Sequence, residues 1–212
     1  MFDLKVGFSC NNNCIHCVVD DKKVFKDLTT EQIKDIIRTR VPEDEPIITF
    51  TGGEASIRHD FIELIRFAKE TGRSVYLQTN GTGFADPKIA EAAAPYLDHV
   101  LLAIHSNDRD VHNAIVRHQN PGNSASMYDL TMQGFRNLAA LKVNLHTQTV
   151  ISKLNMPTLL ETIRFIQTVI PGKYMNLTYP HPMGGAYTNW QIVCPKYSEL
   201  KPYLDPVLRE FH

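Results

Sequence analysis

Three cysteines near the start of the chain have the spacing of ligands to one inorganic centre. Of the four cysteines in the sequence, Cys10, Cys14 and Cys17 lie within eight residues, in the order Cys-x3-Cys-x2-Cys. An iron–sulfur cube has four irons, so three cysteine ligands would leave one iron free to bind and activate a small molecule. The three asparagines between Cys10 and Cys14 suit a tight polar loop, because asparagine tolerates unusual backbone angles.

Other uses of these cysteines fit the pattern less well. A disulfide is disfavoured because the chain has few cysteines and begins with no secretory leader. A structural zinc site needs four ligands, and Cys194 is a better fourth ligand than His16, which adjoins Cys17 and would strain a tetrahedral site. A two-cluster ferredoxin would need more cysteines in a different run. The three-ligand cluster is therefore the preferred interpretation, and zinc is its alternative.

The bulk composition predicts one globular domain without disulfides. The 212 residues, of which 43 % are hydrophobic, suffice for one large core, so we expect a single domain over residues 1–212. A net charge of −1 disfavours a dedicated nucleic-acid surface. No run approaches the roughly eighteen apolar residues that a membrane span needs. The first residues lead directly into a strand pattern, which predicts no leader and a reducing, cytoplasmic location.

Hydrophobic periodicity predicts strands and helices that alternate along the chain. The expected strands cover residues 4–9, 46–51, 74–79, 99–104, 143–151 and 174–178. The expected helices cover 29–41, a segment from Ile57 to about Gly72, 87–96, a segment through Met127 and Leu138, 157–170 and 198–211, the last weakened by Pro202 and Pro206. The strand at 99–104 is nearly continuous in apolar residues, so both its faces are expected to be buried. Such alternation predicts an α/β fold with helices outside a parallel sheet.

The polar motifs follow the expected strands. Cys10, Gly52, Asn80 and Ser106 each come at or just after the end of a strand. In barrel-like α/β folds the carboxyl ends of the strands surround one mouth, where sites are built. We therefore expect these motifs, although distant in sequence, to meet around the cysteines.

Together these motifs resemble those of the radical S-adenosylmethionine (radical SAM) superfamily. The resemblance rests on Cys10-x3-Cys14-x-His16-Cys17, on Gly52-Gly53-Glu54 after the second strand, on Thr79-Asn80-Gly81-Thr82 after the third, and on His105-Ser106 with Arg117 after the fourth. It covers about residues 3–180 and is closest in pattern to the peptide-modifying and molybdopterin-type branches. The fold that the resemblance implies is a partial (β/α)6 TIM-like barrel with a parallel sheet and outer helices.

The resemblance implies a cluster and a SAM site. Cys10, Cys14 and Cys17 would ligate a [4Fe–4S] cluster, and the methionyl amino and carboxylate groups of SAM would chelate its fourth iron. Glu54 would act at the catalytic centre by accepting a charge-assisted hydrogen bond from the methionyl amino group. Backbone could approach the methionine moiety closely at Gly52 and Gly53, which lack side chains.

Five further residues are implied as SAM contacts. His16 precedes the third cysteine, a position that often touches adenine in the family. Ser106 would contact the ribose or the carboxylate, and Arg117 the carboxylate. Thr79 and Asn80 complete the expected cofactor-binding set.

The implied reaction is reductive cleavage of SAM. One electron from the reduced cluster would split SAM into methionine and a 5′-deoxyadenosyl radical, which removes a hydrogen atom from an unidentified peptide or small-molecule substrate. Such an oxidoreductase needs a reductant such as flavodoxin or ferredoxin. The sequence departs from the family pattern at Ala55, where many members have proline, and at His105-Ser106-Asn107-Asp108 in place of Ser-Asp-Gly.

Two rival functions fit the sequence less well. A conventional methyltransferase or dinucleotide enzyme is suggested by Gly81-x-Gly83, but Asp86 stands where the fingerprint needs its third small residue. A non-catalytic iron–sulfur or zinc-binding protein remains the alternative, although the Gly-Gly-Glu motif would serve no purpose there.

Other conspicuous residues carry weaker expectations. Cys194 is expected near the mouth or on the wall leading from it, most simply as a small buried hydrophobe. Its alternatives are a hydrogen-atom donor to a substrate radical or, if a C-terminal extension is missing, a ligand of an auxiliary cluster. Residues 179–187 are expected at the mouth, as a substrate-contacting loop, a lid or an ordinary loop. Arg58 is expected as a charge on a helix surface. Surface or core positions without a metal are expected for His59, His112, His118 and His146. The chain is then either a minimal core enzyme or a piece that lacks a C-terminal auxiliary domain.

Overall fold

One parallel sheet organises the chain. The computed structural model describes residues 1–120, 122, 125–171 and 173–211. Six parallel strands follow one another across the sheet in sequence order. They are β1 (Phe2–Lys5), β2 (Ile47–Thr51), β3 (Ser74–Thr79), β4 (His99–Ala103), β5 (Leu145–Val150) and β6 (Met175–Thr178). Among the described residues β1 pairs only with β2 and β6 only with β5, so the sheet is not closed into a full barrel.

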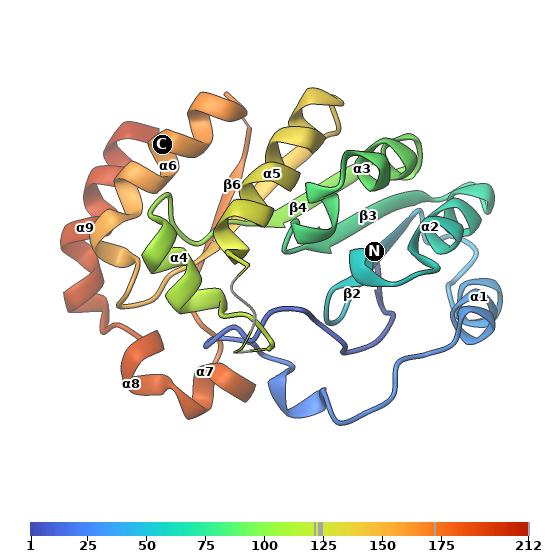
Figure 1. The fold of residues 1–212 in the computed structure, drawn as a ribbon, viewed down its shortest axis with the longest axis horizontal. Coiled ribbons are helices and arrows are strands. Elements are labelled where there is room, and N and C mark those ends of the chain that lie inside the picture. The colour runs from blue at the N-terminus through green and yellow to red at the C-terminus, as the bar shows by residue number, and fades with distance from the viewer. Residues whose placement is uncertain (121, 123–124, 172, 212) are drawn as a thin grey trace.

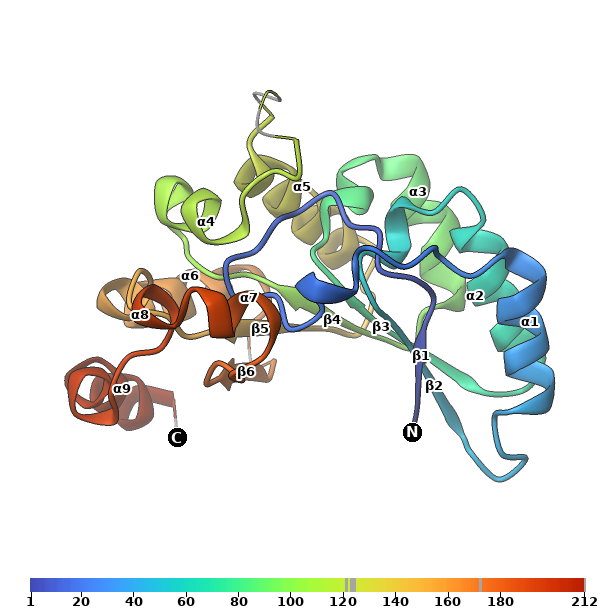
Figure 2. The same cartoon turned by 90° about the horizontal axis from the view of Figure 1, so that it is seen from below.

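The helices surround this sheet. They are α1 (Thr30–Thr39), α2 (Phe61–Glu70), α3 (Pro87–Ala93), α4 (Arg109–Val116), α5 (Met127–Ala140), α6 (Leu159–Val169), α7 (Gly184–Thr188), α8 (Trp190–Val193) and α9 (Tyr197–Phe211). In Figure 1, α1, α2, α3, α5, α6 and α9 form an arc from right to left around the sheet. α7 and α8 lie below that arc, and Figure 2 shows α7 beside the short 3₁₀ helix η1 (Asp20–Lys22), which it contacts. In the described part of the chain, no helix has the length and apolar character to cross a membrane.

Two helices begin where their sequence signals place them. Thr29 caps α1 in a capping box: its hydroxyl accepts from the Gln32 N–H at 3.3 Å, and its own N–H donates to the Gln32 side chain at 2.9 Å. Pro87 is the first residue of α3, and the Asp86 carboxylate accepts from the Lys88 N–H at 2.9 Å. Both start signals are confirmed.

The two faces of the sheet differ in character. Val75 and Leu77 of β3 and Val100 and Leu102 of β4 are buried in the main core against the helices. On the other face of β4, Leu101 and Ala103 are only partly buried and line a cavity. The expectation that β4 is buried on both faces is therefore wrong: one face packs into the core and the other borders open space.

Several boundaries differ from those expected. The first strand ends at Lys5 rather than Ser9: beyond it, the Gly7 carbonyl accepts from the Gly53 N–H, which lies past the end of β2. The segment from Ile57 does not begin a helix: Ala55–Ile57 forms the 3₁₀ helix η2, and α2 starts only at Phe61. The polar stretch after β4 contains α4, a helix not expected from the sequence; Asp108 caps it by accepting from two backbone N–H groups.

Arg58 is not the helix-surface charge that was expected. Its side chain is only 11 % exposed and forms an ion pair with Asp60 at 2.7 Å. Its guanidinium also donates to the carbonyl oxygens of Val6 and Leu28, each at 3.0 Å. Arg58 thus fastens the chain after β1 to the segment that enters α1.

Candidate functional site

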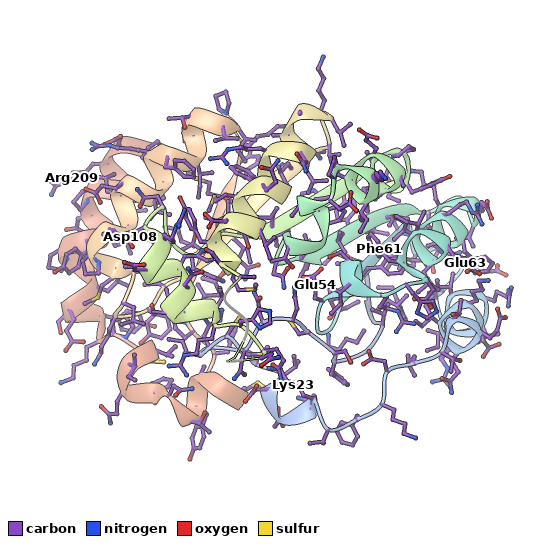
Figure 3. All side chains as sticks on the ribbon, viewed as in Figure 1. Lys23, Glu54, Phe61, Glu63, Asp108 and Arg209 are labelled. Atoms are coloured by element: carbon purple, nitrogen blue, oxygen red, sulfur yellow. The ribbon has the colours of Figure 1, made fainter. Side chains whose placement is uncertain are left out.

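A cavity of about 450 Å³ lies at the carboxyl ends of the strands. Its floor is the inner face of the sheet, with Gln78 of β3, Leu101 of β4 and Gln148 of β5. In Figure 3, Glu54 lies near the middle of the molecule, and Lys23, which follows η1, lies below it. The cavity brings together nine of the predicted site residues, which are Cys10, Cys14, His16, Cys17, Gly52, Gly53, Glu54, Thr79 and Asn80.

The cysteine loop, residues 10–17, is fastened on one side by the end of α4. The Ile15 N–H donates to the Ile115 carbonyl at 2.9 Å, and the Asn13 N–H donates to the Val116 carbonyl at 3.0 Å. The Ile15 side chain is buried with Ile115 and Val116 in a small apolar cluster. The helix missed in the sequence therefore helps to position the loop.

The other side of the cysteine loop is held by α7. The Gly185 N–H donates to the Cys17 carbonyl at 2.8 Å, and the Asn189 side-chain amide donates to the Ile15 carbonyl at 3.0 Å. Gly184 has φ +50, and a Cβ there would lie 2.5 Å from the Cys17 carbonyl oxygen. Part of the loop expected after β6 is thus a helix that packs on the cysteines, while Tyr179 and its two following residues line the cavity.

The Gly-Gly-Glu motif packs against the chain that leads to Cys10. The Gly53 N–H donates to the Gly7 carbonyl and the Glu54 N–H to the Ser9 carbonyl, each at 2.9 Å. Gly52 has φ +127, and a Cβ at Gly53 would lie 2.0 Å from the Ser9 carbonyl oxygen. Whatever else they contact, both glycines are required by this close backbone approach.

The Glu54 carboxylate is buried, with the residue 3 % exposed, and is held by four donors. Oε1 accepts from the N–H and the hydroxyl of Ser56 at 3.1 and 2.6 Å and from the Thr79 hydroxyl at 2.7 Å. Oε2 accepts from the Asn80 N–H at 2.6 Å. Burial raises the pKa of Glu54 above its ordinary value, and the hydrogen bonds oppose this only in part. Because a carboxylate oxygen can accept more than one hydrogen bond, Oε2 can take a further donor from the cavity.

Three histidines line the cavity beside the cysteine loop. The ring centroids of His16 and His105 are 4.6 Å apart, and those of His105 and His112 are 5.8 Å apart. Burial lowers the pKa of His16 and of His112 to about 4 and that of His105 well below its ordinary value, so all three are neutral near pH 7. His105 Nδ1 faces the Val150 N–H at 3.3 Å, and His112 Nδ1 faces the His105 N–H at 3.4 Å, which places each proton on Nε2.

Sequence reasoning gave His105 and His112 no role in the site. His112 was expected as a surface or core residue without a metal, and it is buried in the cavity wall. The signal that could have found His105 was its place at the end of the fourth strand, one residue before Ser106.

Two predicted contacts are not brought to the cavity in the described residues. Ser106 is fully buried, and its hydroxyl accepts from the Asp108 N–H at 3.0 Å, as in an ordinary turn. Arg117 is exposed, at the end of α4. Their assignment to SAM stays a prediction that the geometry does not support. Cys194 is buried beside Ile15 and Val193, behind the cysteine loop, which matches its interpretation as a small hydrophobe.

Comparison with known proteins decides the family. A model of the radical SAM superfamily matches residues 4–166. The chain belongs to the radical SAM superfamily. The family uses a [4Fe–4S] cluster and SAM, so the cofactors expected from the sequence are those of the family.

Radical SAM relatives match over much of the chain. The mycofactocin maturase MftC of Mycobacterium tuberculosis is 27 % identical over 195 residues, which are 90 % of this chain and 47 % of that protein. The AdoMet-dependent heme synthase of Methanosarcina barkeri is 25 % identical over 155 residues, 72 % of this chain and 43 % of that protein. The chain thus spans about half the length of these curated relatives.

Solved radical SAM structures share the fold. Streptococcus suis SuiB bound to S-adenosylmethionine superposes with a TM-score of 0.74 at 15 % identity, covering 98 % of this chain and 46 % of SuiB. Native anSMEcpe with bound AdoMet and a peptide superposes with a TM-score of 0.69 at 16 % identity, covering 85 % of this chain and 51 % of that one. The predicted partial barrel is confirmed.

The residues present fit the radical SAM cofactors. Buried side-chain atoms without a hydrogen-bond partner are rare in proteins. In the described residues five such atoms occur, and three of them belong to the cysteine loop: both amide atoms of Asn12 and Nδ1 of His16. These three atoms lie beside three free thiols on the cavity wall. A polar group bound there would give them hydrogen-bond partners.

A single-ion zinc site fits less well. No three His, Cys, Asp or Glu side chains of the described residues are placed to hold one metal ion. Structural zinc needs four ligands on one ion, whereas a [4Fe–4S] cube takes its protein ligands on different irons. Cys194, the proposed fourth zinc ligand, does not line the cavity in the described part of the chain.

The three thiols of the cysteine loop would lose their protons only when a metal is bound beside them. Burial raises the pKa of Cys10 to about 11, to which the Glu54 charge adds, and burial also raises the pKa of Cys14 and of Cys17. Lys23 opposes this; its Nζ lies 3.2 Å from Asn13 Oδ1 and pairs with Asp20 at 2.8 Å. The positive charge of bound irons is what would deprotonate these cysteines.

Proposed function

We propose that this chain is the core of a radical SAM enzyme that cleaves SAM reductively, with residues 1–212 acting as one core domain. When bound and reduced by one electron, the cluster and SAM would supply a 5′-deoxyadenosyl radical able to abstract hydrogen from a substrate. The observation that carries the proposal is one cavity lined both by Cys10, Cys14 and Cys17 and by the buried carboxylate of Glu54.

The residues on each side of the cavity then have separate roles. The three cysteines would hold the cluster through their thiolates, and hydrogen bonds to α4 and α7 fix the cysteine loop. Glu54 would bind the methionyl ammonium of SAM through Oε2, while hydrogen bonds from Thr79 and Asn80 hold the Glu54 carboxylate in place. His16, which carries an unpartnered Nδ1 within the described residues, offers that nitrogen and its ring to the remainder of SAM.

We assign the substrate to the peptide class. SuiB has been solved bound to its precursor peptide SuiA and covers 99 % of this chain, with a TM-score of 0.71 and 12 % identity. In the described residues, the side-chain amides of Gln78 and Gln148 on the cavity floor have no hydrogen-bond partner and can pair with peptide groups. The reductant would be a flavodoxin or ferredoxin, and a reducing cytoplasm would suit an oxygen-sensitive cluster.

The proposal is tested by anaerobic reconstitution with iron and sulfide, followed by reduction and incubation with SAM. We expect a brown protein with about four irons per chain and slow formation of 5′-deoxyadenosine and methionine, seen by chromatography. Replacing Cys10, Cys14 and Cys17 together by Ala should abolish both. Stoichiometric zinc in a colourless protein, or S-adenosylhomocysteine as the main product, would overturn it.

A further inference from the structure

The Asn80 side chain joins the cysteine loop to the loop after β3. Its Nδ2 donates to Asn11 Oδ1 at 2.9 Å and faces the Cys10 sulfur at 3.9 Å. Asn11 Nδ2 donates to the Thr82 hydroxyl at 2.8 Å, and that hydroxyl donates to Asn80 Oδ1 at 2.7 Å. Asn11, Thr82 and Asn80 thus form a closed ring of three side-chain hydrogen bonds.

The orientation of the Asn80 amide follows from a backbone group. The Thr82 N–H, which can only donate, points to Asn80 Oδ1 at 3.0 Å. That contact identifies the oxygen of the amide, so the other atom, facing Cys10, is the NH₂ group. The Cys10 sulfur therefore has two N–H groups directed at it: the Asn12 backbone N–H at 3.3 Å and the Asn80 side chain at 3.9 Å.

Asn80 also contacts the carboxylate of the site. Its backbone N–H is the donor to Glu54 Oε2 at 2.6 Å, and its carbonyl oxygen accepts from the Thr131 hydroxyl at 2.9 Å. The residue is thereby fixed between a cysteine sulfur and the Glu54 oxygen that has room for another donor.

Hydrogen bonds to cysteine sulfurs are one of the levers that set the reduction potential of an iron–sulfur cluster. Reduction adds negative charge to the cluster, and an N–H donor stabilises that charge. We propose that Asn80 is a positioning residue that raises the reduction potential of the cluster through its N–H···S contact with Cys10. The inference rests on the proposed function, because it needs the cluster, but it concerns a residue that the cysteine motif does not include.

The test compares reduction potentials of the reconstituted full chain, measured by dye-mediated titration followed by electron paramagnetic resonance. Asn80→Ser keeps a short acceptor for the Thr82 N–H but has no N–H that reaches Cys10. Asn80→Asp replaces the NH₂ group by a negative oxygen. The expected order of potentials is wild type above Asn80→Ser above Asn80→Asp, with iron content unchanged.

The matched control is Thr82→Val, which breaks the same ring but leaves the Asn80 NH₂ group and the Thr82 backbone N–H in place. Its potential should stay close to that of the wild type. A shift as large as that of Asn80→Ser would show that the potential depends on the ring and not on the N–H···S contact, which would overturn the inference. Equal potentials for wild type and Asn80→Asp would overturn it as well. If the wild type binds no cluster, the proposed function fails as well; if it binds one and only the order of potentials is wrong, the proposed function stands.

Discussion

The Glu54 N–H donates to the carbonyl oxygen of Ser9 at 2.9 Å, one residue before the first cysteine of the motif. Two motifs that lie more than thirty residues apart in the sequence are therefore joined by a backbone hydrogen bond. A displacement of either segment must move the other. The cluster site and the carboxylate site should consequently respond together to changes in the packing between them.

Substituting Gly53 by Ala should disrupt both sites. The new Cβ would lie 2.0 Å from the Ser9 carbonyl oxygen, so the backbone must move apart. We expect a loss of roughly 1–3 kcal/mol in the free energy of unfolding, as for other overpacked positions, together with reduced iron content. Urea unfolding and iron analysis measure these effects. In the control Gly122→Ala, the added Cβ meets, among the described residues, only an ordinary contact at 3.5 Å with the Asn120 side chain, and stability should hold.

Glu54→Gln should weaken SAM binding. Gln keeps an oxygen for Ser56 and Thr79 but removes the charge that would bind the methionyl ammonium. A hydrogen bond to a charged group contributes roughly 1.5–3 kcal/mol, which corresponds to an increase of about 10- to 150-fold in the Kd for SAM. Equilibrium binding to the reconstituted protein measures it, with the exposed Glu70→Gln as control. Unchanged affinity in Glu54→Gln would remove Glu54 from the site.

The sequence predicts those features of the site that depend on residues close together in the chain. The cysteine spacing and the strand-end position of Glu54 are local, and both were recognisable. The contacts that hold the cysteine loop, from Ile115 and from Gly185, join residues about one hundred or more positions apart. Hydrophobic periodicity within a short window of sequence gives no information about such pairs.

The missed features have identifiable causes. α4 has only eight residues, and its start signal, Asp108 as an N-cap, stood in the sequence unused. Arg58 was taken for a surface charge because the apolar spacing placed it inside a helix; in the structure it precedes the helix and points inward to Asp60. Ser106 was assigned to SAM by a loose resemblance to the Ser-Asp-Gly region of the family, but its hydroxyl accepts the Asp108 N–H in a turn.

The Arg58–Asp60 pair should make stability depend on acid pH. Burial raises the pKa of Asp60, but the hydrogen bonds from Arg58 and Thr30 and the Arg58 charge lower it by more, so the folded-state pKa is below the ordinary value. The stabilisation is then complete above the unfolded-state pKa, near 4, and is lost as the pH falls through the lower folded-state pKa.

Asp60→Asn tests this dependence. At pH 7 the variant should lose roughly 3–5 kcal/mol in the free energy of unfolding, because Arg58 keeps a buried charge without its partner. The difference from wild type should shrink as the pH is lowered below 4 in unfolding experiments. The exposed Asp44→Asn is the control and should behave as wild type. A pH-independent difference would contradict the assignment.

Cys194→Ala should keep the cluster. Cys194 is buried with Ile15 and Val193 behind the loop and has no place on the cavity wall in the described residues. We expect the iron content and the SAM cleavage of the wild type, with a loss of about 1 kcal/mol in stability from the smaller side chain. Cys14→Ala is the contrasting variant and should lose the cluster. If Cys194→Ala loses iron while the other three cysteines are intact, Cys194 is a ligand.

Asn189→Ala should loosen the cluster with little effect on the global fold. Its side-chain amide donates to the carbonyl oxygens of Ile15 and Gly185, at 3.0 and 2.8 Å, and so connects α7 to the cysteine loop. Losing these bonds should cost about 0.5–1.5 kcal/mol each at most, yet it frees the segment between Cys14 and Cys17. The sensitive measurement is the rate at which a chelator strips iron from the reconstituted protein, which should increase. Gln191→Ala changes an exposed amide on neighbouring α8 and should leave this rate unchanged. Equal rates for wild type and Asn189→Ala would show that the Asn189 amide does not help to hold the loop.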